Sequence, residues 1–196
     1  MNKNYYLLTF RKKMLLLLIL SIYSTLSNSQ EKDDLIIWST KHKLSWNDFT
    51  GEPNYKRRAS AISFLEINNI IAYSNSEIYS YTIIPVFVKS KSSVKNKNQN
   101  LLEHEQIHFD IQEIFARKIR KHFQLLKKIN ACDYTYSDIY LKYGDSLFVY
   151  QNKYDLSTNY SSAQKNQEHW KEIAAKKLKK LDAFSVENLY GINEED

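Results

Sequence analysis

The sequence predicts an α+β fold in which antiparallel strands come first and helices follow. Two observations lead to this fold class. Short apolar or alternating runs, typical of strands, occur along residues 35–89, with Gly and Pro between them. Apolar residues spaced three and four apart, typical of helices, recur along residues 101–181. The longest predicted helix carries a short motif of histidine and glutamate, and we expect the rest of the chain to be organised around it.

Residues 1–29 are predicted to be a secretory signal peptide. Four basic residues accompany a short apolar run, Met14–Leu20, and the small residues Ser27–Ser29 offer a cleavage site. This run is shorter than the roughly 20 residues that span a bilayer, so we expect no transmembrane segment after cleavage. An uncleaved N-terminal anchor is the alternative. In both cases residues 30–196 are expected to form one exported domain, periplasmic or secreted.

The charge of the chain gives little support for nucleic-acid binding. The formal net charge is +6, but the predicted signal peptide holds four basic residues and no acidic one. The remainder has 24 basic and 22 acidic residues. No basic patch is interleaved with aromatic residues, so we expect no nucleic-acid partner. The lysine-rich run Lys176–Lys180 is expected to be the solvated face and last turn of a helix.

The strands are predicted in the first half of the chain. Pro85 falls inside the longest of them, and because proline cannot donate to a strand ladder, it is expected at a sheet edge or a bulge. An edge strand close to the motif helix would suit an extended peptide substrate, and a purely structural hairpin is the alternative. Residues 48–53 contain Gly and Pro and are predicted to be a loop. The predicted strands are Leu35–Trp38, Lys43–Trp46, Ala59–Ile67 and Glu77–Lys89.

Three helices are predicted in the second half. Polar stretches at residues 89–100 and 152–162 are expected to be irregular. Asn100 with Glu103 resembles a capping box at the start of the first helix, and Asn130 is expected to end it. The predicted helices are Leu101–Leu126, Tyr136–Gln151 and Ala163–Leu181. The first has a buried stripe, Ile107, Ile111, Phe115, Ile119 and Phe123, with Lys118, Arg120, Lys121 and Gln124 on other faces.

Residues 104–108 of the first helix form the motif H-E-x-x-H. Residues four apart lie one turn above each other on a helix, so His104 and His108 can direct two imidazoles at one Zn²⁺. Zinc lowers the pKa of a bound water to about 7, and Glu105 is then placed to act as general base. The motif therefore predicts a zinc peptidase. Two solvated histidines on an amphipathic surface helix are the alternative.

Three stretches of the chain together form a recognisable pattern. They are Trp38 with Leu44–Phe49 and Gly51–Pro53, then Leu102–Asp110, then Tyr154–Thr158 with Gln167 and Trp170. In this order they resemble the bacterial family of predicted secreted zinc-dependent proteases, the domain of unknown function nine-two-two. The resemblance covers nearly all of residues 30–196, and it implies a zincin-like fold, a bound Zn²⁺ and a peptidase activity.

The third zinc ligand is expected outside the motif, because a catalytic zinc normally holds three protein ligands and one water. Asp155, predicted between two helices, is the first candidate, and capping a helix or turn is its alternative role. Tyr160 stands where the family pattern has a histidine, and Tyr160 and His169 remain open as ligands. His122 lies about 21 Å along the helix from His108 and is excluded.

Two further residues are expected to contact the ligands without binding the metal. These are Asp110, for which a surface charge is the alternative, and Tyr154. The single cysteine, Cys132, cannot form an internal disulfide and is expected to be buried or idle. The sequence thus predicts an exported zinc metallopeptidase that acts on a peptide or protein substrate. The alternative is a non-catalytic envelope protein that binds zinc or a partner.

Overall fold

The computed structural model describes residues 33–74 and 77–190. The chain divides into two compact units, Met1–Leu35 and Ile36–Asp196. The predicted signal peptide, residues 1–29, lies outside the described residues. Within the described ranges, no helix combines the length and the apolar character needed to cross a membrane.

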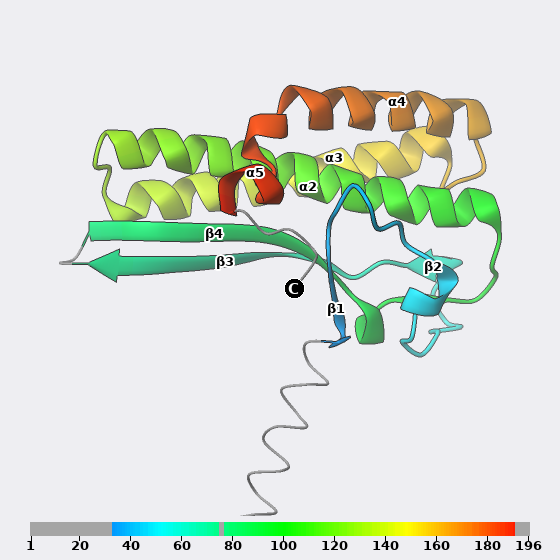
Figure 1. The fold of residues 1–196 in the computed structure, drawn as a ribbon. Helices are drawn as coiled ribbons and strands as arrows, with labels where there is room; N and C mark the ends of the chain where they lie inside the picture. The colour runs from blue at the N-terminus through cyan, green and yellow to red at the C-terminus, as the bar shows by residue number, and fades with distance from the viewer. Residues whose placement is uncertain (1–32, 75–76, 191–196) are drawn as a thin grey trace, which may run out of the picture. The chain divides into compact units, whose positions relative to one another are not determined.

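The second unit has two layers, in which helices cover one face of a sheet (Figure 1). The predicted α+β class, with strands before helices, is confirmed. The strands are β1 (Leu35–Ile37), β2 (Ala61–Ile62), β3 (Leu65–Ser74), β4 (Glu77–Val88) and β5 (Ser93–Val94). The helices are α2 (Gln99–Lys128), α3 (Asp133–Thr158), α4 (Gln164–Lys180) and α5 (Val186–Tyr190). Short 3-10 turns are η1 (Trp46–Asp48), η2 (Lys89–Lys91) and η3 (Asp182–Phe184).

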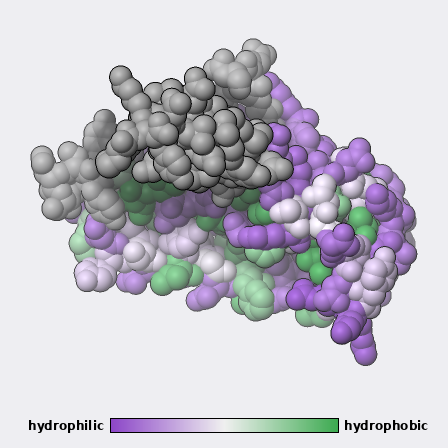
Figure 2. All heavy atoms as spheres, turned by 90° about the horizontal axis from the view of Figure 1, so that it is seen from below, coloured by the Kyte–Doolittle hydropathy of each residue, from purple (hydrophilic) through white to green (hydrophobic). Residues whose placement is uncertain are grey.

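The strands form two small sheets. β3 and β4 pair as an antiparallel hairpin with Leu65 opposite Phe87, and β1 adds on the other side of β4 to give the order β1-β4-β3. β2 pairs with β5 in a separate two-stranded sheet. Where grey atoms do not cover it, the face seen from below mixes apolar and polar side chains (Figure 2). Ile70 on β3 is 65% exposed.

Two strand predictions are wrong, because contacts distant in sequence decide the local structure. Residues 59–67 do not form a single strand, because they hold β2 of the smaller sheet and the start of β3 of the larger one. Between the two strands, the N–H of Phe64 donates to Ser92 Oγ at 2.9 Å instead of to a neighbouring strand. Residues 43–46 form no strand. There, the N–H of Leu44 donates to the side chain of Gln106 on α2 at 2.8 Å and so has no need of a ladder partner.

The prediction for Pro85 is also wrong, because β4 is the central strand of its sheet. Pro85 lies opposite Ile67 of β3, and its carbonyl accepts from the N–H of Trp38 at 3.2 Å on the β1 side. β1 ends at Ile37, just before that contact. The nitrogen of Pro85 therefore points to the β1 side at a level where β1 has already ended. Its missing N–H costs no hydrogen bond between strands.

Helix α2 is the centre of the core. Its side chains take part in all three apolar clusters, which join it to α3 and α4, to β4, and to residues 38–49. The predicted stripe from Ile107 to Phe123 is confirmed, with no member more than 3% exposed. Side chains on other faces are buried as well, since His104 is 3% exposed and Glu113, Arg117 and Arg120 are at most 1% exposed, and the exposed Lys121 and Leu125 lie near the end of the helix. The alternative of an amphipathic surface helix is therefore wrong.

The ends of α2 differ slightly from the prediction. The side chain of Asn98, not Asn100, caps the first turn by accepting from the N–H of Leu101 at 2.9 Å. At the other end, Asn130 adopts a left-handed φ of 49°, which few residues other than glycine and asparagine tolerate. The predicted stop at Asn130 is confirmed.

Helix α3 is longer than the sequence predicts, and this changes the setting of one candidate ligand. The helix continues through the stretch expected to be irregular and ends at Thr158, followed by left-handed residues from Asn159 to Ser161. Tyr154 and Thr158, one turn apart, are fully buried, whereas Asn152 and Lys153 point to solvent. Asp155 therefore lies on a helix and not in a loop. The predicted third helix is confirmed as α4.

Candidate metal centre

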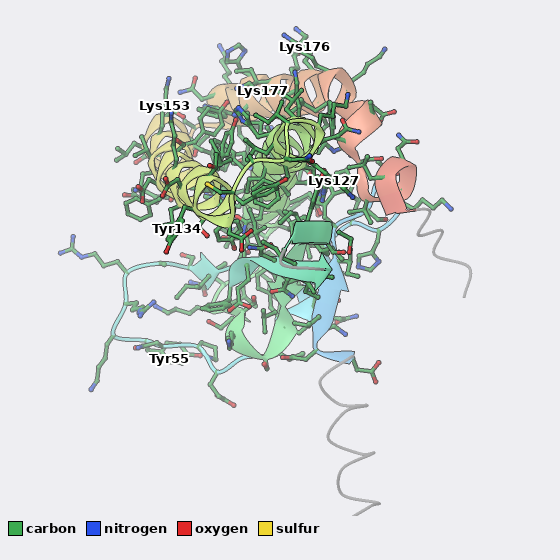
Figure 3. All side chains as sticks on the ribbon, turned by 90° about the vertical axis from the view of Figure 1, so that its left-hand side faces the viewer. Tyr55, Lys127, Tyr134, Lys153, Lys176 and Lys177 are labelled. Carbon is green, nitrogen blue, oxygen red and sulfur yellow. The ribbon has the colours of Figure 1, made fainter. Side chains whose placement is uncertain are left out.

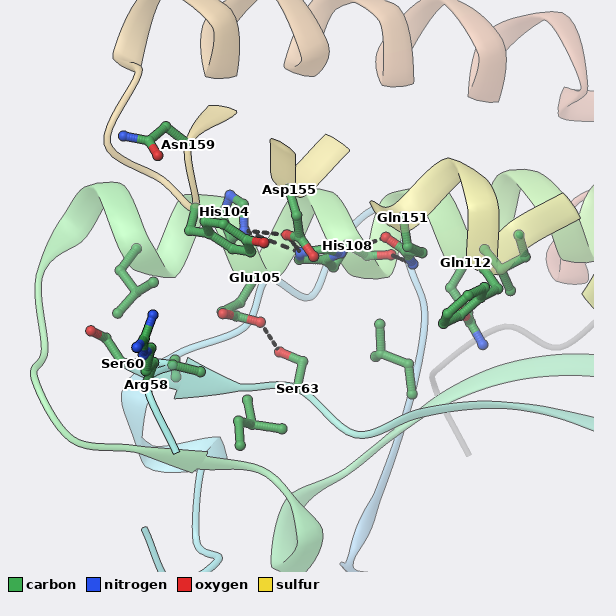
Figure 4. A pocket seen from close by; sticks show the side chains of 18 of the residues that line it. Arg58, Ser60, Ser63, His104, Glu105, His108, Gln112, Gln151, Asp155 and Asn159 are labelled. Atoms are coloured by element: carbon green, nitrogen blue, oxygen red, sulfur yellow. Dashed lines mark hydrogen bonds and ion pairs between the residues drawn. The ribbon is translucent and has the colours of Figure 1, made fainter. Parts of the chain in front are cut away.

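Three side chains from two helices converge on one point. The Nε2 atoms of His104 and His108 on α2 lie 3.1 Å apart, and Asp155 Oδ1 on α3 lies 3.0 Å from the first and 2.8 Å from the second (Figure 4). His104 is buried, and the other two are partly buried. This cluster could hold a metal ion.

The helix geometry explains this convergence. The two histidines lie one turn apart on the same face of α2, as the motif predicts. α3 runs antiparallel along that face, so Gln151 faces His108 and Asp155, one turn later, faces both histidines. Tyr154 fixes the neighbouring rings. It stacks on His104 with centroids 4.6 Å apart and meets His108 edge-on at 4.8 Å.

The chemistry of the three donors fits a divalent cation. Gln151 Oε1 can only accept, so His108 Nδ1 carries the proton and its Nε2 presents a lone pair. That lone pair faces a carboxylate oxygen and a second imidazole nitrogen, an arrangement that only a proton or a cation can relieve. A zinc ion with bonds of about 2.0–2.1 Å holds tetrahedral ligand atoms about 3.3 Å apart, close to the separations found here.

Electrostatics in the metal-free cluster point the same way. Burial lowers the pKa of His108, but the hydrogen bond to Asp155 and the charges of Glu105 and Asp155 outweigh it, so this pKa is raised from 6.5. Burial raises the pKa of Asp155, but the bonds and charges of His104 and His108 outweigh it, so this pKa lies well below its usual value. The site thus favours positive charge between the histidines and Asp155.

Glu105 lies beside the cluster on the next position of α2. It is 5% exposed, and Ser63 Oγ donates to its Oε2 at 2.5 Å (Figure 4). Ser63 follows β2, so the strand side of the cleft holds this carboxylate in place. Glu105 is not one of the three converging donors, and its second oxygen stays available for proton transfer.

Gln151 is a site residue that the sequence did not reveal. Besides accepting from His108 Nδ1, its Nε2 donates to the backbone carbonyl of His108 at 3.0 Å, so one side chain holds both ring and backbone. The i, i+4 spacing of Gln151 and Asp155 would have indicated a shared face had the helix been predicted through both. Glutamine is also not a typical metal ligand, so residue type gave no signal.

The cluster lies in an open cleft of about 980 Å³. One wall is the segment from Arg58 to Ser63, which includes β2, and the other is α3 (Figure 4). Leu147 and Phe148 line the cleft toward the Gln112 end, and Asn159 and Tyr160 line it toward the Leu101 end. This volume is in the range of ligand-binding clefts.

The remaining candidates lie elsewhere. Asp110 was expected to contact a ligand histidine, and this is wrong, because two residues along a helix reverse the direction of a side chain. Its Oδ1 accepts instead from Trp38 Nε1 at 2.8 Å and Gln106 Nε2 at 2.9 Å. Tyr160 lines the cleft but is 62% exposed and outside the converging cluster, and His169 is exposed on α4.

Two other residues can be placed. His122 bonds through Nδ1 to Tyr143 OH at 2.8 Å, which agrees with its exclusion as a ligand. Cys132 is a free thiol on the surface, so the expectation of a buried side chain is wrong and an idle thiol remains.

Comparison with protein-family models, with curated protein sequences and with solved structures finds no match to this chain.

Proposed function

We propose that this protein is an exported zinc-dependent peptidase with a zincin-like site. The observation that carries the proposal is the convergence of His104, His108 and Asp155 next to Glu105 inside an open cleft. Two imidazoles and one carboxylate, with a position left for water, are the ligand set of many hydrolytic zinc sites. Mg²⁺ and Ca²⁺ prefer all-oxygen sites, so this donor set favours zinc.

The chain's own residues divide the work of peptide hydrolysis. A zinc ion held by the three donors would supply Lewis acidity and lower the pKa of a water to about 7. Glu105 takes a proton from the attacking water on the carboxylate oxygen that Ser63 does not hold and returns it to the departing amine. Gln151 keeps the His108 ring in the tautomer that leaves Nε2 free.

The cleft suits an extended peptide. The segment from Arg58 to Ser63, which includes β2, lies along one wall, and a strand in that position can offer backbone hydrogen-bonding groups to a chain laid beside it. Phe148 and Leu147 form an apolar patch at one end of the cleft.

The proposal that the protein is exported rests on the basic and apolar pattern of residues 1–29 and on the family resemblance.

The test is to measure bound zinc and hydrolysis of a denatured protein for the wild type and three variants. His108→Ala should lose zinc and activity together. Glu105→Gln should keep zinc and lose activity by roughly 10²- to 10⁴-fold, the usual contribution of a general base. Glu103→Gln is the matched control, because Glu103 lies on the same helix but pairs with surface Lys171 and should change neither property.

Two outcomes would overturn the proposal. If the wild-type protein takes up no zinc after metal loading, both the metal centre and the peptidase fail. If one zinc binds per chain and depends on His108, but no substrate is cleaved, the metal centre stands and the peptidase fails. The protein would then be a non-catalytic zinc-binding or partner-binding envelope protein.

A further inference from the structure

A second cavity, of about 570 Å³, opens between the C-terminal half of α2, α3 and the end of α4. It shares no lining residue with the metal cleft. Lysines from two helices surround it, namely Lys118 and Lys121 on α2 and Lys177 and Lys180 on α4. Of the residues that the structure describes, no acidic one lines it.

The four lysines differ from the neighbouring arginines in their described partners. Among the described residues, none of the four makes an ion pair within 4 Å. The neighbouring Arg117 and Arg120 on the same helix differ sharply, because Glu113 bonds to both of their guanidinium groups. The fold therefore supplies a counter-charge where it buries arginines, whereas no carboxylate of residues 33–74 or 77–190 pairs with the adjacent lysines.

Aromatic rings hold two of the ammonium groups in place. Lys177 Nζ donates to Tyr150 OH at 2.7 Å, and Lys118 Nζ lies 3.9 Å from the centroid of the Phe115 ring. Both ammonium groups approach the Tyr150 ring, at 4.5 and 6.0 Å from its centroid. Burial and then the charge of Lys177 lower the pKa of Lys118. Two like charges are thus fixed close together, at a cost that a bound anion would relieve.

The helix dipole does not account for the cluster. Lys177 and Lys180 lie in the last turn of α4, where cations favour the helix terminus. Lys118 and Lys121, in contrast, lie two turns or more before the end of α2 at Lys128, beyond the reach of that effect. The helix dipole therefore does not explain the positions of Lys118 and Lys121.

We propose that this cavity binds an anion with an apolar body, such as a fatty-acid carboxylate or a lipid phosphate. Charge-assisted hydrogen bonds from Lys118 and Lys177 would hold the anionic group. Leu125, Tyr143 and Leu181 and the alkyl stems of the lysines would contact the apolar part. A cavity of this volume exceeds the need of a bare inorganic anion and falls within the range of organic ligands.

The test uses dodecyl phosphate below its micelle concentration, titrated calorimetrically into the full protein. We expect saturable binding of one molecule per chain. The double variant Lys118→Gln with Lys177→Gln should weaken it by roughly 100-fold or more, the effect of losing two charged hydrogen bonds. The matched control, Lys153→Gln with Lys176→Gln, removes the same charge from exposed positions of α3 and α4 (Figure 3) and should leave binding unchanged. Thermal melting and zinc content verify that each variant is folded.

Other probes separate the possible results. Inorganic phosphate that binds as tightly as dodecyl phosphate would overturn the role of the apolar body. A neutral dodecyl glycoside that binds equally well, or equal losses in the two double variants, would overturn the role of the anion. Binding to phosphatidylglycerol vesicles but not phosphatidylcholine vesicles, displaced by dodecyl phosphate, would identify a membrane lipid as the source. Binding of the dispersed amphiphile alone would identify a soluble ligand. No binding of any probe overturns the proposal.

Discussion

Replacing Gln151 by methionine should weaken zinc binding without unfolding the protein. Gln151 accepts from His108 Nδ1 and donates to the His108 carbonyl at 3.0 Å, so methionine removes both bonds with little change in volume. The other tautomer of His108, with its proton on Nε2, then becomes accessible, and that tautomer cannot bind a metal through Nε2.

The expected magnitude follows from these two bonds. A neutral hydrogen bond contributes about 1 kcal/mol, and loss of a partner that orients a ligand histidine typically costs 10- to 100-fold in metal affinity. We therefore expect the dissociation constant for zinc to rise by roughly 10- to 100-fold, or about 1.4–2.7 kcal/mol. Competition with a chromophoric chelator measures this constant.

Two further variants make the result specific. Asn152→Met is the matched control, because Asn152 is the next residue on α3 and is exposed. Gln151→Glu keeps an acceptor for Nδ1 and removes the donor to the carbonyl, so it should retain most of the affinity. A change of less than about twofold in Gln151→Met, against the 10- to 100-fold range, would refute the role of Gln151 in orienting the ligand.

Three other predictions concern stability and the cleft. Glu113→Gln leaves the fully buried Arg120 without a counter-charge and leaves Arg117 only the 3.5 Å contact with exposed Asp182, so it should lower the free energy of unfolding by about 3–5 kcal/mol in urea titrations. The surface pair broken in Glu103→Gln should cost less than about 1 kcal/mol. In chelator-treated protein, the raised pKa of His108 stabilises the fold below pH 6.5, and the lowered pKa of Asp155 stabilises it above pH 3.8. The stability gap between wild type and Asp155→Ala should therefore be largest between these values and shrink on both sides, and a pH-independent gap would contradict the pairing. Phe148→Ala should raise KM for an apolar peptide and leave kcat and melting temperature unchanged, because Phe148 lines the cleft and is 69% exposed.

Local patterns were sufficient to predict the part of the site that lies on one helix. The spacing of His104 and His108 fixes their common face, and the apolar stripe predicts α2 to within two residues at each end. The polar stretch 152–157 hid the continuation of α3, because its exposed side dominates the composition while Tyr154 and Thr158 are buried.

Features that depend on contacts between distant segments were not predictable. The position of Gln151 opposite His108 requires the antiparallel packing of α3 on α2, which no local pattern encodes. The end of β2 is set by its pairing with β5, in which Ala61 lies opposite Val94, 33 positions further along the chain. Pro85 is tolerated in a central strand only because the neighbouring β1 is three residues long.

The division of the three proposed metal ligands between α2 and α3 would have a consequence for folding. His108 and Asp155 are 47 residues apart in sequence, so an ion bound by both closes a long loop of the chain, much as a disulfide would. At a free zinc concentration 100 times the dissociation constant, binding adds about 2.7 kcal/mol to the stability of the folded chain. Zinc supply would then set the lifetime of the protein against unfolding and degradation, independently of any reaction in the cleft.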